Sequence, residues 1–212
     1  DAIARYLQDV ASDDALDAGL SNAMGWVVRR TMVRIDRACT LNERLSLTTF
    51  CTGVGRTWAE RRTTITGAAG GDTDVAVEAV SLWVQVDADT GRPTRLGPDF
   101  FDLSGEAAAG RTVSSKLGLA GPPADAERRR WQFRGTDIDP FDHVNNAAQW
   151  AVAESLLEGR GRLGTTELEY LAPVGADEID LLVNGDAAWL VVDGRTLSAV
   201  AWTPPGSDVR IS

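Results

Sequence analysis

The sequence predicts an α+β protein made of two similar units, each a helix wrapped by an antiparallel sheet. Three observations support this prediction. A segment with helical periodicity opens the chain, strand-like segments follow it, and the pattern restarts after an intervening region as a strand, a helix and more strands. The two halves share this architecture but little residue identity. Two such sheets can join edge to edge, which removes two exposed sheet edges.

In the first half, residues 3–18 have the spacing of a helix, because Ile3, Leu7 and Val10 recur on one face. The segments that follow are rich in β-branched residues and alternate in part between apolar and polar side chains, which is typical of strands. These segments are residues 26–36, 44–55, 57–67 and 74–87. The last one alternates strictly, which indicates a strand with one face on the core. We expect this unit to lack the opening strand that the second unit has.

A change of composition separates the two halves. Residues 88–127 are rich in glycine, proline, aspartate and alanine, so we expect the end of a hairpin and then a linker that crosses the surface. We therefore place an N-terminal domain at residues 1–110, a linker at residues 111–127 and a C-terminal domain at residues 128–212.

The second half opens with a strand-like segment, residues 129–139, that runs into a polar turn. Residues 145–158 are expected to be helical because Trp150, Ala153 and Leu157 share one face. Short strands separated by glycine and aspartate turns complete the unit. They are residues 165–174, 178–185, 187–194 and 196–204.

Charge and composition exclude several classes of protein. The formal net charge of −10 argues against nucleic-acid binding, which needs a cationic face. No apolar run approaches the roughly 18 residues of a membrane-spanning helix, and no secretory signal opens the sequence, so we expect no membrane partner. Cys39 and Cys51 have neither metal-binding nor redox spacing, so we expect reduced thiols in a cytoplasmic protein without a metal ion.

An acidic partner would need a local basic patch on so acidic a chain. One candidate patch for docking a carrier protein is the run Arg128, Arg129 and Arg130 in "ERRRW". A second set comprises Arg29, Arg30, Arg34 and Arg37. A solvated strand edge or linker explains either set equally well.

The segment "GTDIDPFDHVNNAAQW", residues 135–150, concentrates the polar chemistry of the chain. It holds Asp137, Asp139, Asp142 and the only histidine of the sequence, His143, just ahead of the expected helix. Such a cluster can be an active site, or it can be a turn whose polar side chains cap the helix. Both interpretations stay open, and Asp137 and Asp142 fit the capping role better.

Several segments together resemble the acyl-acyl carrier protein thioesterases of bacterial type, which are built as a tandem of two hotdog folds. The resemblance covers nearly the whole chain. It rests on "YLQDVASDDALDAG", "WVVRRTMVRIDR", "GVGRTWAERRTTI", "AVSLWVQVDADTGRPTRL" and "DIDPFDHVNN" with the helix that follows. It implies a hydrolase that releases free fatty acid from acyl-acyl carrier protein, with coenzyme A thioesters as a close variant. It implies no cofactor.

The resemblance places the aspartate and the histidine of the family's motif at Asp139 and His143. The position between them that the family fills with asparagine holds Phe141, which has no hydrogen-bonding side chain. Pro173 and Val174 stand where plant-like members carry a glutamate and a cysteine. The turn therefore looks more like that of simpler hotdog thioesterases, which use an acidic residue, water and a helix N-terminus.

Thioester hydrolysis needs a nucleophile at neutral pH, a stabiliser for the oxyanion and a route for the proton. We expect Asp139 to act as general base on water, and His143 to orient the water or donate to the carbonyl oxygen. A helix start near residues 144–146 would offer N–H donors to the oxyanion. Asn145 either takes part in this chemistry or caps the helix. Glu154 is a reserve base, or else an exposed helix residue.

Aromatic residues suggest a site for the acyl chain. Trp26, Trp58 and Trp83 fall in the first half, where the family holds its acyl chain, although core packing is the default for tryptophan at strand positions. Phe141 and Asn146 are expected beside the substrate at the turn. We expect acyl carrier protein or a coenzyme A thioester as partner, and a monomer or homodimer. The alternative is a hotdog protein that binds an acyl chain, or regulates, without hydrolysis.

Overall fold

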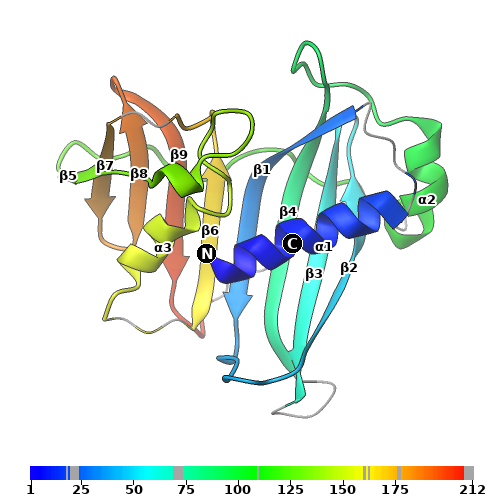
Figure 1. The fold of residues 1–212 in the computed structure, drawn as a ribbon, viewed down its shortest axis with the longest axis horizontal. Coiled ribbons are helices and arrows are strands. Elements are labelled where there is room, and N and C mark those ends of the chain that lie inside the picture. The colour runs from blue at the N-terminus through cyan, green and yellow to red at the C-terminus, as the bar shows by residue number, and fades with distance from the viewer. Residues whose placement is uncertain are drawn as a thin grey trace.

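The computed structural model describes residues 1–207 apart from residues 18, 20–23, 69–73, 109, 160, 162, 176 and 177. It confirms the mixed α+β class, with one large antiparallel sheet and few helices (Figure 1). In chain order the elements are α1 (Ala2–Asp17), β1 (Met24–Ile35), β2 (Leu45–Val54), β3 (Trp58–Gly67), β4 (Val75–Asp87), α2 (Pro98–Ala108), β5 (Glu127–Trp131), the 3₁₀ turn η2 (Gly135–Asp137), α3 (Trp150–Leu156), β6 (Gly164–Tyr170), β7 (Ile179–Asn184), β8 (Ala187–Val192) and β9 (Arg195–Thr203). No helix in the described residues is long and apolar enough to cross a membrane.

The strands form one nine-stranded sheet in the order β2-β3-β4-β1-β6-β9-β8-β7-β5. Neighbouring strands pair antiparallel throughout. The two halves of the chain meet where β1 pairs with β6, from Arg30 opposite Glu169 to Ile35 opposite Gly164. Because this pairing makes the sheet continuous, β2 and β5 are left as its edges.

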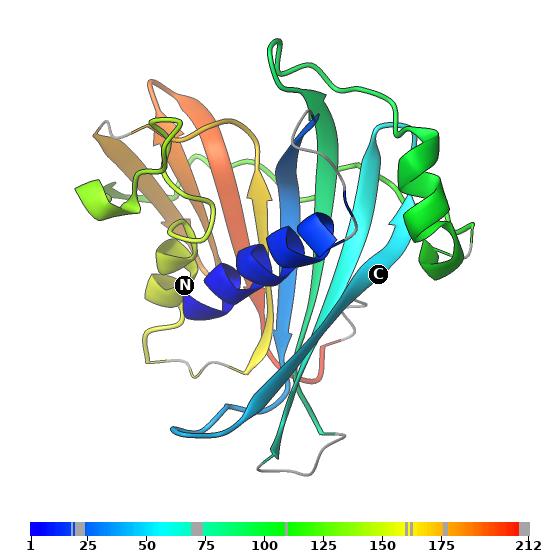
Figure 2. The same ribbon diagram turned by 45° about the vertical axis from the view of Figure 1, so that its right-hand side comes forward.

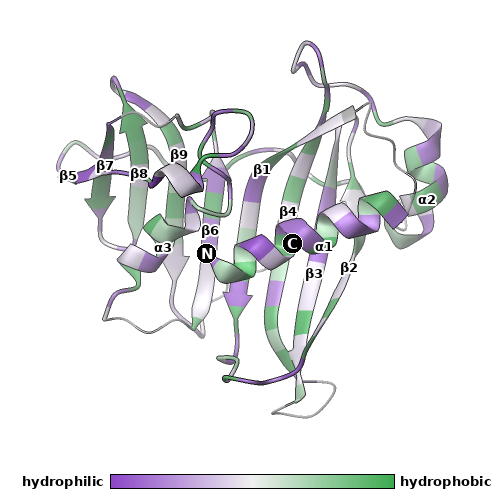
Figure 3. Ribbon diagram, in the orientation of Figure 1, coloured by the Kyte–Doolittle hydropathy of each residue, from purple (hydrophilic) through white to green (hydrophobic). Residues whose placement is uncertain are grey.

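The helices α1 and α3 lie on one face of the sheet, with α1 across the first half and α3 across the second (Figures 1 and 2). The main buried cluster joins these helices to the strands behind them. It includes Leu7 of α1, Val33 of β1, Val152 of α3 and Leu168 of β6. Hydrophobic and hydrophilic residues alternate along the strands (Figure 3), so the sheet turns its apolar side toward the helices.

The linker between α2 and β5 crosses the opposite face of the sheet, behind the strands in Figure 1. Two indole N–H groups hold it: Trp58 Nε1 of β3 donates to the carbonyl oxygen of Val113 over 2.9 Å, and Trp189 Nε1 of β8 donates to that of Ala120 over 2.8 Å. Between these points the buried carboxylate of Glu169 accepts two backbone N–H groups of the linker. The linker is therefore fastened to strands of both halves.

The segment ahead of this linker corrects one prediction. We expected a hairpin end and a loop there, and the structure instead has α2. Pro98 stands at the first helical position, where its missing N–H leaves no helical bond unmade and its fixed φ suits the helix. Phe100 and Ala108 of α2 are buried against the first half of the sheet. The glycine and the aspartates of this stretch disguised its helical periodicity.

The helix after the polar turn is shorter than the predicted range of residues 145–158. Residues ahead of α3 form tight turns, in which the Ala148 N–H donates to the Asn145 carbonyl over 2.9 Å. The Asn145 side chain also accepts from the Ala147 N–H over 2.8 Å. Such local side-chain bonds compete with α-helical pairing, which explains why α3 begins at Trp150.

Candidate active site

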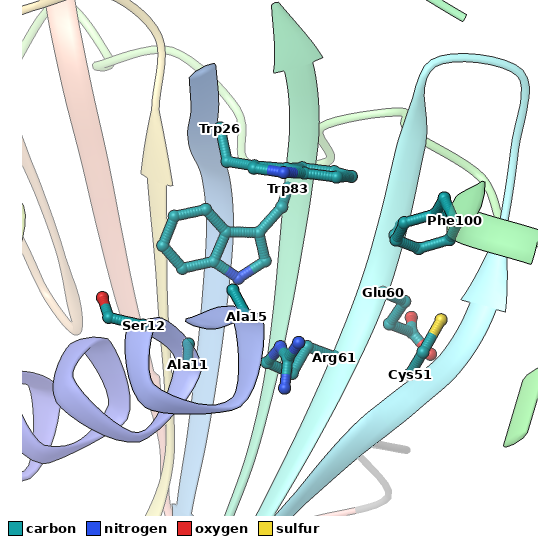
Figure 4. Close-up of a pocket in the computed structure, with 10 residues that line it drawn as sticks. Ala11, Ser12, Ala15, Trp26, Cys51, Glu60, Arg61, Trp83 and Phe100 are labelled. Atoms are coloured by element: carbon teal, nitrogen blue, oxygen red, sulfur yellow. The ribbon is translucent and has the colours of Figure 1, made fainter. Parts of the chain in front are cut away.

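A cavity of about 220 Å³ lies in the first half, between α1 and the sheet (Figure 4). Small side chains of α1 form one wall, and aromatic side chains of β1, β4 and α2 form others. The lining residues are Ala11, Ser12, Ala15, Trp26, Cys51, Ala59, Glu60, Arg61, Trp83 and Phe100. A mostly apolar hollow with a few polar groups is the usual form of a small-molecule site.

Aromatic rings and a buried thiol form the apolar wall of this cavity. The ring centroids of Trp26 and Phe100 lie 5.6 Å apart, with an interplanar angle of 40°. Cys51 and Ala59 belong to the same buried cluster as Phe100. Burial raises the pKa of the Cys51 thiol, so the thiol stays neutral and acts as an apolar group. This wall suits a hydrocarbon chain.

Two charged residues also reach the cavity wall, and each has a partner within the protein. The carboxylate of Glu60, which is 1% exposed, accepts from Thr52 Oγ1 over 2.9 Å and from Arg111 Nη1 over 3.0 Å. Arg61 Nη1 donates to Asp14 Oδ2 of α1 over 2.6 Å. Because these charges are already paired, the cavity does not require a charged ligand.

A second, smaller pocket adjoins the cavity at Trp83, which lines both. Its other walls come from α1, β1 and β4 of the first half, and from the segment around α3 and β6 of the second half. They comprise Ala4, Leu7, Gln8, Val28, Thr31, Ser81, Asn146, Ala147, Trp150 and Tyr170. Trp83 therefore stands between the cavity of the first half and Asn146 of the polar motif.

Buried hydrogen bonds connect the walls of the smaller pocket. Trp150 Nε1 donates to Tyr170 Oη over 3.0 Å, and this hydroxyl donates to the carbonyl oxygen of Asn146 over 3.3 Å. The hydroxyl oxygens of Thr31 and Ser81 lie 3.0 Å apart. Burial raises the pKa of Tyr170 above its ordinary value, so the phenol stays protonated and can donate.

The backbone N–H of Asn146 has no hydrogen-bond partner within the described part of the chain. Its neighbours on both sides are engaged, because the Asn145 N–H donates to the Asp137 carbonyl over 2.8 Å and the Ala147 N–H donates to Asn145 Oδ1. We predicted N–H donors from a helix start here, whereas α3 begins later. The Asn146 N–H is the donor of this segment that stays available to a ligand.

The turn that carries Asp139 and His143 is closed by its own aspartate. Asp139 Oδ1 accepts from the backbone N–H groups of Phe141, over 2.9 Å, and His143, over 3.1 Å. Asp142 completes the turn in the left-handed region, with φ of 63°. Asp139 Oδ2 and the exposed imidazole of His143 have no partner among the described residues, so both can meet water or a substrate.

The structure brings together only part of the set of predicted site residues. Trp26 and Trp83 line the cavity, and Trp83 and Asn146 line the smaller pocket. Asp139 and His143 sit on the turn just before Asn146 in sequence. Among the residues described, neither of them belongs to the lining of the two hollows.

Other predicted site residues make local contacts instead. Trp58 donates to the linker, and Asn145 caps the tight turn ahead of α3. Glu154 is half exposed on α3, where its carboxylate contacts the amino group of Asp1. The Phe141 side chain is 80% exposed at the tip of the turn. These positions show no contact with either hollow.

The predicted docking patch lies on β5, an edge strand at the opposite end of the sheet from the cavity strands β2 and β3. Each guanidinium has a nearby carboxylate: Arg128 pairs with Asp180, Arg129 with Glu127 over 2.8 Å, and Arg130 with Glu178 over 3.2 Å. These pairs balance the positive charge of the run locally. A docking role for this patch stays a prediction.

Sequence reasoning missed the polar residues of the smaller pocket other than Asn146, and one wall of the cavity. Thr31 and Tyr170 look like ordinary strand residues, since a hydroxyl in a strand carries no signal of its own. Ser81 could have been found, because it alternates with Trp83 on one face of its strand. Phe100 was hidden in the segment that we interpreted as a loop.

Comparison with known proteins assigns the chain to a family. The family model for the acyl-ACP thioesterase N-terminal domain matches residues 1–103. Two uncharacterized proteins of Mycobacterium tuberculosis, MT2057 of strain CDC 1551 / Oshkosh and Rv2001 of strain ATCC 25618 / H37Rv, are 30% identical over 182 residues. That match covers 84% of this chain and 71% of each relative. The chain belongs to the acyl-ACP thioesterase family.

Solved structures share the fold of this acyl-ACP thioesterase family member. The 12:0-ACP thioesterase from Umbellularia californica is 20% identical with a TM-score of 0.75, covering 96% of this chain and 89% of that one. An acyl-ACP thioesterase from Bacteroides thetaiotaomicron is 18% identical with a TM-score of 0.78, covering 95% and 87%. At such identities the likeness shows the fold alone.

Proposed function

We propose that this chain hydrolyses the thioester of acyl-acyl carrier protein, or of acyl-coenzyme A, and releases a free fatty acid. We also propose that its halves are two hotdog units in tandem, joined where β1 pairs with β6. The observation that carries the function is the mostly apolar cavity, whose wall at Trp83 adjoins the pocket of Asn146. An acyl chain bound in the cavity would bring its thioester toward the smaller pocket.

The smaller pocket supplies a place for the thioester carbonyl. In the proposed complex the carbonyl oxygen accepts from the free N–H of Asn146, and the Tyr170 hydroxyl holds the Asn146 residue through its carbonyl group. A fixed donor aimed at a developing oxyanion lowers the barrier to acyl transfer.

The turn before Asn146 supplies the proton chemistry. With Oδ1 of Asp139 fixed by the turn, Oδ2 takes a proton from a water molecule whose oxygen attacks the carbonyl carbon. A carbon–oxygen bond forms, the carbon–sulfur bond then breaks, and the leaving thiolate takes a proton through His143. The products are a fatty acid and the free thiol of the carrier.

Thiol release from acyl carrier protein and coenzyme A thioesters, followed with a thiol-reactive dye, tests this proposal. Asp139→Asn keeps an oxygen acceptor for the turn but removes the base, so turnover should fall by about 10²- to 10⁴-fold. Asp142→Asn is the matched control, because it lies in the same turn and asparagine tolerates a positive φ. Near-native turnover in Asp139→Asn would remove Asp139 from the mechanism.

A non-catalytic protein that binds an acyl chain is the second candidate. Phe141, Pro173 and Val174 favour it, because these apolar residues stand where the family resemblance implies polar groups. The same assay separates the two functions. Tight acyl binding with no enzyme-dependent thiol release supports the binding protein.

A further inference from the structure

One polar atom in the wall of the cavity lacks a partner. Trp83 Nε1 is buried and makes no hydrogen bond within the described residues. Figure 4 draws the Trp83 ring inside the cavity, with its nitrogen on the edge that faces α1. Because Trp83 also lines the smaller pocket, its ring borders both hollows.

Three other polar residues of the cavity wall have partners. Glu60 and Arg61 are paired as described above, and Ser12 Oγ donates to the Gln8 carbonyl over 3.0 Å. Within the described lining, Trp83 Nε1 is the buried donor left over. The cavity is therefore mostly apolar with one buried N–H that lacks a partner, and a few polar groups in an apolar hollow are what orient a ligand.

The ligand in the cavity determines the free-energy cost of leaving this N–H unpaired. The N–H is shielded from water in the described structure, and a plain hydrocarbon chain offers it no acceptor. A buried donor left unpaired costs free energy, so a site that holds one favours a ligand that carries its partner over a ligand that lacks it. An oxygen on the acyl chain would supply this partner.

We propose that the preferred acyl chain carries an oxygen, as a hydroxyl or an oxo group, on the carbons that pass Trp83. This inference rests on the proposed function, since it names the class of acyl group that the same site takes. Trp83 is then a specificity-determining residue, whose N–H donates to the oxygen of the substituent.

Two sets of substrates of equal chain length test the proposal: unsubstituted acyl thioesters, and hydroxyacyl thioesters with the hydroxyl at successive positions. We expect at least one hydroxyacyl thioester to be preferred in kcat/KM by about fivefold to tenfold. Trp83→Phe keeps a ring but removes the N–H, so this preference should disappear. Trp26→Phe is the matched control in the same wall, because the Trp26 nitrogen is not buried, so water can satisfy its N–H and its loss should not change the preference.

The outcome is separable from that of the proposed function. If no thioester is hydrolysed at all, hydrolysis fails as a function, and calorimetric binding of the matching hydroxylated and plain fatty acids still tests the inference. The wild-type preference needs no variant, so a misfolded Trp83→Phe leaves the test intact. Equal affinity and equal kcat/KM at every hydroxyl position, or an unchanged preference in a folded Trp83→Phe, overturns it.

Discussion

The two helices on the front of the sheet pack in opposite ways. α1 spans 16 residues, and its buried residues are Ala4 and Leu7. α3 spans 7 residues, and its buried residues are Trp150, Val152, Ala153 and Leu156. The longer helix lies over a cavity with small side chains facing it, whereas the shorter helix fills the space beneath itself.

This difference separates two tasks that one sheet supports. The first half contains the cavity, and the charged groups in the cavity wall are paired, so the cavity stays mostly apolar. In the second half, apolar side chains pack α3 and the Asn146 segment against the sheet. Mutations in the two helices should therefore affect different properties, stability in α3 and substrate choice in α1.

The largest expected effect is on stability, from Leu156→Ala in α3. Leu156 is buried in the main cluster, so truncation should lower the free energy of unfolding by about 2–5 kcal/mol. Leu16→Ala in α1 is the matched control, because Leu16 is exposed and should cost less than about 0.5 kcal/mol. Denaturant unfolding of both variants measures the difference, and equal losses would contradict the proposed contrast between the helices.

His143→Ala should lower turnover by about 100-fold or more if the imidazole moves a proton. The side chain is exposed and lacks a partner in the described residues, so thermal unfolding should change little. The comparison of kcat with the melting temperature separates catalysis from folding. Near-native turnover would exclude His143 from the reaction.

Ala15→Leu should reduce kcat/KM for long acyl chains by about tenfold while short chains are spared, because the added atoms occupy the cavity under α1. Ala2→Leu is the control at the other end of the same helix, where the side chain is exposed. A kinetic series over chain length reads out the effect. A uniform loss at every length would point to a disturbed helix instead of a filled cavity.

The smallest expected effect comes from the arginine run on β5. Charge reversal at Arg129 should weaken carrier-protein substrates by no more than about threefold, and small thioesters less, because the guanidinium is already paired with Glu127. Side-by-side kcat/KM values for the two substrate classes measure this. Equal loss on both classes would argue against docking at this patch.

The accuracy of each predicted element depended on whether its sequence pattern was local. α1 and the strands of both halves lie within a few residues of their predicted ranges, because alternation and helical spacing are properties of neighbouring residues. The strand expected to reach Asp139 ends at Trp131, since a 3₁₀ turn from Gly135 interrupts it. α2 was not predicted, because its glycine and aspartates are typical of a loop.

The candidate site was harder to predict, since its walls come from distant parts of the chain. Trp26 and Trp83 could be singled out as aromatic strand residues, but nothing in their surroundings separates them from Trp58, which faces the linker. The bond between Trp150 and Tyr170 depends on how α3 settles on β6. Only the folded chain shows that these residues meet Asn146.

The hydrogen bonds that hold the linker to β3 and β8 limit the relative motion of the two halves. Trp58 and Trp189 tie one extended peptide to strands on both sides of the β1–β6 seam, so a hinge motion about that seam would strain both ties. Product escape by the swinging apart of the two halves is therefore disfavoured. On the front face α1 buries Ala4 and Leu7 alone, so we expect a shift of α1, and not a separation of the two halves, to open the cavity for product release.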